Sequence, residues 1–174
     1  MPRALRLVLL CALGLVVLAL AALGASAVLD RPAKVVTTSA VVEAPKPVVW
    51  DVLTDFDAYE EWNPVFRKAS GKAEEGSSLE LDATFPGHGS ERLDAEVLIV
   101  RDDRKLRWQD RLVAPGVRDW EYEFVLQPVE PGRVVVVQVL RAEGLLAPFA
   151  DDGAAREALG LIGEALAQRV EQRG

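Results

Sequence analysis

The chain of 174 residues shows no group of residues in a pattern typical of nucleophilic, acid–base or metal chemistry. Its single histidine, His88, lies between two glycines in a turn sequence, where we expect it to face solvent. Its single cysteine, Cys11, lies in an uncharged run and can form no intrachain disulfide. With one histidine and no usable cysteine, we expect no zinc site, and we expect no cofactor.

Asp110 is the acidic residue whose position bears most on catalysis. It shares the alternation of Leu106, Trp108 and Leu112, which would turn its carboxylate inward, whereas an edge position or a local bulge would expose it. A buried carboxylate needs a partner, and Tyr122 or Arg118 on the next expected strand could supply one. Because proton transfer requires a titratable group of suitable pKa inside a cavity, Asp110 and Tyr122 are the two weak catalytic candidates.

Five aromatic side chains fall on faces that the sequence pattern turns inward, namely Phe85, Trp108, Trp120, Tyr122 and Phe124. Burial in a core would be enough to explain them, because large aromatic rings supply much of a core's apolar area. Alternatively, they would line a cavity and offer an apolar ligand flat contact surfaces, with hydrogen-bonding groups at the indole N–H and the phenol O–H. Leu159 and Ile162, on the apolar stripe of the last helix, are candidates for the opposite wall.

One strand and two short helices are expected before the main run of strands. Residues 35–43 are rich in valine and threonine and predict the strand. Pro47 suits a first helical position, and the apolar residues after it recur at helical spacing. Residues 57–60, Asp-Ala-Tyr-Glu, have the form of a capping box and predict a second short helix, which must end before Pro64.

From residue 65 on, the apolar period changes to two, which predicts strands joined by turns. The expected strands cover residues 65–74, 79–85, 93–99, 106–112, 120–127 and 134–140. Successive side chains of a strand point to opposite faces, so the apolar positions combine into one inward face.

The chain closes with an amphipathic helix, which Asp151 or Asp152 could cap. Its apolar stripe consists of Ala155, Ala158, Leu159, Ile162, Leu166 and Val170. This stripe needs a surface, and the concave face of the sheet is the only large one expected. Gly160 and Gly163 each weaken the helix by roughly 1 kcal/mol relative to alanine, and they indicate either close helix-to-sheet packing or room for a ligand.

The first 29 residues have the pattern of a membrane segment. Arg3 and Arg6 precede an uncharged run of 23 residues, 7–29, which is long enough to cross a bilayer. The alternative is a signal peptide cleaved near Ala27, because residues 25–27 have the small-x-small form of a cleavage site. In both cases the preceding positive charge predicts that the rest of the chain lies outside the cytoplasmic membrane, either anchored there or secreted or periplasmic.

The rest of the chain is acidic. Without residues 1–29 it keeps 18 basic and 27 acidic residues, a net charge of −9. Such a domain repels phosphate backbones, and no basic stripe interrupts the pattern, so we expect no nucleic acid binding. We therefore expect an anchor or signal peptide over residues 1–29, a short linker over 30–34 and one domain over 35–172.

The order of one strand, two short helices, six strands and a long helix resembles that of the START and polyketide-cyclase-like superfamily, also called SRPBCC or helix-grip. The resemblance also rests on VWDVLTDFDAYEEWNP at residues 49–64 and KLRW at 105–108. It implies an α+β fold in which a seven-stranded antiparallel sheet curls around the C-terminal helix, with a hydrophobic cavity between them. Members bind lipids, sterols, polyketides or other apolar small molecules, and some catalyse aromatic cyclisation or dehydration. The superfamily has no universal catalytic residue, so the resemblance assigns none here.

Three functions fit these features. The first is binding of a hydrophobic small molecule or lipid by a domain that is tethered to the membrane or exported across it. The second is a polyketide cyclase or dehydratase-like enzyme acting on an apolar substrate, which would need a buried acid or base. The third is a membrane-associated interaction module whose cavity is filled by its own side chains.

Overall fold

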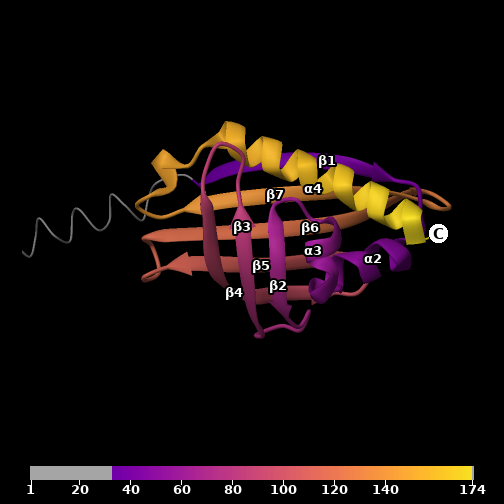
Figure 1. Ribbon diagram of the computed structural model, residues 1–174, viewed down its shortest axis with the longest axis horizontal. Coiled ribbons are helices and arrows are strands. Elements are labelled where there is room, and N and C mark those ends of the chain that lie inside the picture. Colours follow the sequence, from indigo (N-terminus) through magenta and orange to yellow (C-terminus); the bar gives the residue numbers. More distant parts are fainter. Residues whose placement is uncertain (1–32, 174) are drawn as a thin grey trace, which may run out of the picture. The chain divides into compact units, whose positions relative to one another are not determined.

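Seven antiparallel strands run in the order β1-β7-β6-β5-β4-β3-β2 in the computed structural model, which describes residues 33–173 (Figure 1). The strands are β1 (Lys34–Val42), β2 (Phe66–Gly71), β3 (Ser78–Thr84), β4 (Ser90–Arg101), β5 (Lys105–Leu112), β6 (Arg118–Glu130) and β7 (Arg133–Glu143). The helices are α2 (Lys46–Thr54), α3 (Tyr59–Trp62) and α4 (Asp152–Arg173), with short 3-10 turns η1 (Phe56–Ala58) and η2 (Ala147–Phe149). The expected α+β helix-grip fold is confirmed.

The period-two pattern corresponds to the two faces of this sheet. On β5 and β6, Trp108 pairs with Tyr122 and Leu106 with Phe124, and all four side chains are buried. The charged residues between them, such as Arg107 and Glu123, also pair across the two strands. Their ends meet on the opposite face, where Arg107 Nη1 lies 4.0 Å from Glu123 Oε2. One inward, apolar face therefore continues across the sheet, as predicted. The end of β5 is the exception, because Leu112, expected to face inward, is exposed there.

Residues at the ends of α2 and α3 determine where these two short helices begin, meet and end. Pro45 is the N-cap of α2, and the next proline lies in its first turn, where a missing N–H does no harm. Tyr59 Oη donates to the Leu53 carbonyl over 2.7 Å and ties α3 to α2. Asn63 Oδ1 then accepts hydrogen bonds from two backbone N–H groups, which ends α3 and directs the chain into β2.

The capping box predicted at residues 57–60 is wrong. Asp57 belongs to η1, and the N-cap of α3 is Ala58, which makes no side-chain hydrogen bond. The first turn of α3 continues directly from η1, so its N–H groups need no separate cap.

The long helix α4 packs against β1 and β7, and α2 lies beside its carboxyl end (Figure 1). Asp151 caps it as expected, because Oδ1 accepts hydrogen bonds from Gly153 N and Ala154 N. At Gly163, a Cβ atom would lie 2.8 Å from both Ala40 Cβ and Gln138 Nε2. Gly163 is therefore required by close packing of the helix on the sheet.

The predicted membrane segment or signal peptide, residues 1–29, lies outside the described residues. Within residues 33–173, no helix is both long enough and apolar enough to cross a membrane.

Candidate ligand pocket

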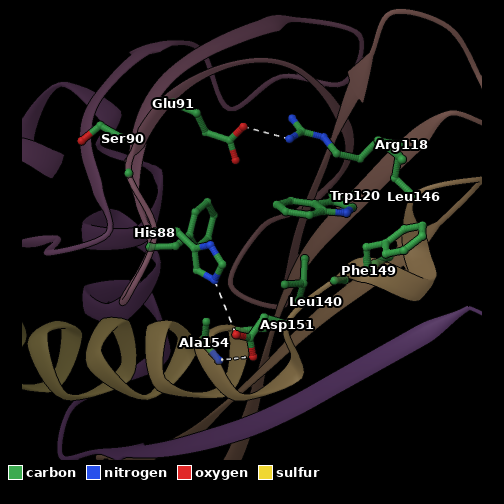
Figure 2. A pocket seen from close by; sticks show the side chains of 15 residues that line it. His88, Ser90, Glu91, Arg118, Trp120, Leu140, Leu146, Phe149, Asp151 and Ala154 are labelled. Carbon is green, nitrogen blue, oxygen red and sulfur yellow. Dashed lines mark hydrogen bonds and ion pairs between the residues drawn. The ribbon is translucent and has the colours of Figure 1, made fainter.

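A pocket of about 480 Å³ lies between the concave face of the sheet and the first turn of α4 (Figure 2). Four parts of the chain form it: the turn from β3 into β4, the start of β6, the end of β7, and the segment from η2 into α4. Its lining residues are Phe85, His88, Gly89, Ser90, Glu91, Arg118, Trp120, Leu140, Ala142, Leu146, Phe149, Ala150, Asp151, Ala154 and Ala155.

Most of the pocket wall is apolar. Phe85 and Trp120 meet edge to face, with ring centroids 6.0 Å apart, and form an aromatic corner. Leu140 and Ala142 extend this wall along β7, with their side chains on the buried face. Phe149 lies at the rim with 81% of its surface exposed. An apolar molecule would therefore find contact surface on several sides.

The polar part of the wall is centred on Arg118. Its Nη1 donates to Glu91 Oε2 over 2.8 Å and its Nη2 donates to Asp110 Oδ2 over 2.7 Å. The guanidinium also lies over the Trp120 ring, 4.6 Å from its centroid, in a cation–π contact. Glu91 and Arg118 line the pocket, whereas Asp110 lies behind them and is 3% exposed.

Burial changes the acidity of the groups behind this wall. Loss of water raises the pKa of the Asp110 carboxyl above its ordinary value, and the contacts with Arg118 oppose that rise only in part. Burial also raises the pKa of Tyr122 well above 10, and the neighbouring Glu91 and Asp110 carboxylates add to the effect. This shift favours the protonated phenol, which can donate or accept a hydrogen bond.

A second polar pair stands at the mouth of the pocket. His88 Nε2 faces Asp151 Oδ2 at 3.5 Å and links the turn after β3 to the start of α4 (Figure 2). Backbone N–H groups of Ala154 and Gly153, followed by His88, hold the pKa of Asp151 below its usual value. The expected exposure of His88 is confirmed, since its side chain is 54% exposed, but it also lines the pocket.

The residues predicted as cavity lining divide into two groups. Phe85 and Trp120 line the pocket. The others, Trp108, Tyr122, Phe124, Leu159 and Ile162, lie deeper in the core and do not line it. The three aromatic residues of this deeper group stack, with Trp108 between Tyr122 and Phe124 at centroid distances of 6.0 Å and 5.3 Å. A contact between them and a ligand stays a prediction.

The two weak catalytic candidates lie close to the pocket but behind its wall. Asp110 faces inward, the first of the two positions considered for it, and pairs with Arg118. The hydroxyl of Tyr122 is buried and has no hydrogen-bond partner among residues 33–173.

Glu91 was missed by the sequence reasoning, although it lies two residues before Leu93 and so shares the buried phase of β4. A charged residue in an apolar phase was the signal that could have found it.

The described part of the chain holds no group of three or more histidine, cysteine, aspartate or glutamate residues that could bind a metal ion. The pairs His88–Asp151 and Arg118–Glu91 line the pocket and can form hydrogen bonds and charge interactions with an organic molecule.

A protein-family model described as polyketide cyclase / dehydrase and lipid transport matches residues 33–173. The chain belongs to this family. The match covers every element described above and confirms the resemblance noted from the sequence. Comparison with curated protein sequences found no match.

Solved structures of the same fold come from several organisms. The START superfamily protein of Mycobacterium smegmatis is 24% identical, with a TM-score of 0.68 over 80% of this chain and 99% of that chain. The Zhui aromatase/cyclase from a Streptomyces species is 21% identical, with a TM-score of 0.61 over 82% and 96%. Norcoclaurine synthase of Thalictrum flavum, solved with dopamine and hydroxybenzaldehyde, is 14% identical, with a TM-score of 0.62 over 82% and 89%.

At these identities the likeness concerns the fold. The matched 80% of this chain corresponds to 99% of the Mycobacterium smegmatis chain. The buried core cluster and the seven strands lie within residues 33–173, so residues 30–174 contain every part of the proposed binding site.

Proposed function

We propose that this domain binds a hydrophobic small molecule or lipid in the pocket between the sheet and the start of α4. The observation that carries this proposal is the pocket itself: about 480 Å³, walled by Phe85, Trp120 and Leu140, in a member of a cyclase and lipid-transport family. Apolar walls with a few converging polar groups are the usual form of a small-molecule site.

The deeper core supports the same location for the ligand. Farther along the sheet, Leu159 and Ile162 of α4 are buried in the same core cluster as Trp108. A ligand would therefore occupy the end of the sheet where α4 begins, since the space farther along is filled by side chains. The hollow at this end of the sheet counts against the third function, an interaction module whose cavity is filled by its own side chains.

We also propose that the domain works outside the cytoplasmic membrane, held there by residues 7–29 or released after cleavage near Ala27. The length of the uncharged run and the arginines before it support this location. The described domain begins beside the pocket. Lys34, at the start of β1, donates from Nζ to the carbonyl of Ala150, which lines the pocket. A linker of five residues spans at most roughly 17 Å. With a retained anchor, so short a linker would keep the domain near the membrane, from which an apolar ligand could come.

The alternative function is that of a cyclase or dehydratase-like enzyme. The observation that favours it is the carboxyl of Asp110, buried beside Arg118 with a raised pKa. Perturbed acids of this kind concentrate at catalytic sites, although structural ion pairs also produce them. Asp110 would have to act through Arg118 and Glu91, which separate it from the pocket. Replacement of Asp110 and Tyr122 without any effect on substrate turnover would remove this alternative.

Native mass spectrometry of residues 30–174, purified from a host with intact membranes, tests the binding function directly. The expected result is a stoichiometric apolar adduct, which solvent extraction would release for identification. If the protein carries no adduct and takes up no added apolar compound, the binding function is wrong.

A further inference from the structure

We infer that the ligand of this pocket ends in a neutral or cationic hydrogen-bond donor, such as a hydroxyl or an amine, and not in an anionic group. This inference rests on the proposed binding function and adds the chemical class of the ligand. It comes from the charges on the pocket wall and from which of their hydrogen-bonding atoms are already engaged.

The only guanidinium that lines the pocket among the described residues is that of Arg118. Both of its terminal nitrogens donate to carboxylates, Nη1 to Glu91 and Nη2 to Asp110. Its remaining nitrogen, Nε, is buried. Each terminal nitrogen keeps a second N–H, but a carboxylate or phosphate that reached it would lie beside Glu91 or Asp110, and like charges so close to each other repel.

Glu91, in contrast to Arg118, offers the pocket a carboxylate oxygen that can still accept a hydrogen bond. Its Oε2 accepts from Arg118, and no hydrogen bond to its Oε1 is found within residues 33–173. The Glu91 side chain is 35% exposed and lines the pocket, so this second oxygen can accept a hydrogen bond from a ligand. Figure 2 shows the oxygen that is not bonded to Arg118 turned toward the space between His88 and Trp120.

The other polar groups of the wall do not reverse this preference. Asp151 adds a second carboxylate at the mouth, and His88, the remaining basic side chain of the lining, is directed at that carboxylate. Asp110 supplies a third acidic group behind Arg118. The pocket thus combines apolar walls with hydrogen-bond acceptors and surplus negative charge, which suits an apolar body that carries a hydroxyl or ammonium group.

Three ten-carbon probes with the same chain and different end groups test this inference: decan-1-ol, decylamine and decanoate. At about pH 8 the amine is cationic and the carboxylate is anionic. Calorimetric titration of residues 30–174 should give decylamine and decanol dissociation constants at least about tenfold lower than that of decanoate.

The variant Glu91→Gln identifies the residue responsible. An amide oxygen can still accept from Arg118, while the amide N–H₂ would offer donors to the pocket in place of an acceptor. We expect the preference of the amine over the carboxylate to fall to within about threefold in this variant. Glu96→Gln is the matched control, because Glu96 lies on the same strand with its side chain exposed on the other face, and it should bind like the wild type.

The outcomes separate the two proposals. If decanoate binds as tightly as the other two probes, or more tightly, the inference about the end group is wrong while the binding function stands. If none of the three probes binds, the proposed function itself is contradicted. An unchanged preference in Glu91→Gln would show that Glu91 does not set it.

Discussion

Arg118 and Asp110 are joined by a hydrogen bond of 2.7 Å from Nη2 to Oδ2, across two adjacent strands and largely out of solvent. The Asp110 side chain is 5% exposed and that of Arg118 is 12% exposed. This pair links the packed core to the pocket, because Arg118 also holds Glu91 at the pocket wall. The geometry of the proposed binding site therefore depends on an ion pair that lies behind it.

Removal of the Arg118 charge should destabilise the domain. In Arg118→Met, Asp110 would remain buried without its partner, which costs about 3 kcal/mol in the free energy of unfolding. Arg92→Met is the matched control, because Arg92 pairs with Glu80 on an exposed surface and its loss should cost less than about 1 kcal/mol. Urea unfolding of both variants measures the difference. Equal and small effects would mean that the Arg118–Asp110 pair contributes little to stability.

Asp110 should also make stability depend on pH in a particular direction. Its pKa is raised in the folded protein, so the folded state keeps the Asp110 proton to a higher pH than the unfolded state does. The contribution of Asp110 to stability is then complete below its ordinary pKa of 3.8 and is lost as the pH rises through the raised value.

Comparison with Asp110→Asn isolates this effect. The unfolding free energy of the wild type, relative to that of the variant, should decrease as the pH is raised from about 3 to about 7. Urea unfolding at a series of pH values measures it. A relative stability that increases over this range would mean that pairing with Arg118 outweighs burial and lowers the Asp110 pKa.

The two glycines in the middle of α4 should respond to alanine in opposite ways. At Gly163 the added Cβ would meet Ala40 and Gln138 at 2.8 Å, so overpacking should destabilise the domain by about 1–3 kcal/mol. At Gly160 nothing lies within 4 Å of the added atom, so Gly160→Ala should stabilise the domain by about 0.5–1 kcal/mol through higher helix propensity. Thermal and urea unfolding give both values. A stabilising Gly163→Ala would contradict the close helix-to-sheet contact.

The fold could be predicted from the sequence because local patterns specify it at each step. Period-two alternation determined the inward faces of the strands, and it correctly left Asp110 in phase with Trp108. The proline and asparagine signals around α2 and α3 marked where those helices begin and end. The capping box failed, because η1 runs directly into α3 and makes a separate cap unnecessary. The alternation also failed at the end of β5, where Leu112 is exposed and Gln109 is buried.

The pocket could be predicted only in part, because alternation gives the face of a side chain and not its position along α4. Trp108 and Trp120 lie on the same face of the sheet. Trp108 is nevertheless buried in the core, whereas Trp120 lines the pocket. That difference depends on where α4 begins to cover the sheet. Asp151 starts the helix beside the β3–β4 turn, a long-range contact that no local pattern contains.

A pocket-filling variant can separate binding in this pocket from binding elsewhere. Ala154 lines the pocket on the first turn of α4, so a tryptophan there would place its ring in the hollow (Figure 2). The cap of α4 would be kept, because Asp151 bonds to the backbone N–H of Ala154. Leu161→Trp is the matched control, since Leu161 lies on the same helix and is 38% exposed.

Titration of decan-1-ol into residues 30–174 of the wild type, Ala154→Trp and Leu161→Trp tests the central claim most directly. We expect the wild type and Leu161→Trp to bind with the same dissociation constant, and Ala154→Trp to bind at least about tenfold more weakly while unfolding as cooperatively as the wild type. Equal binding by all three proteins would contradict the claim that this pocket holds the apolar ligand.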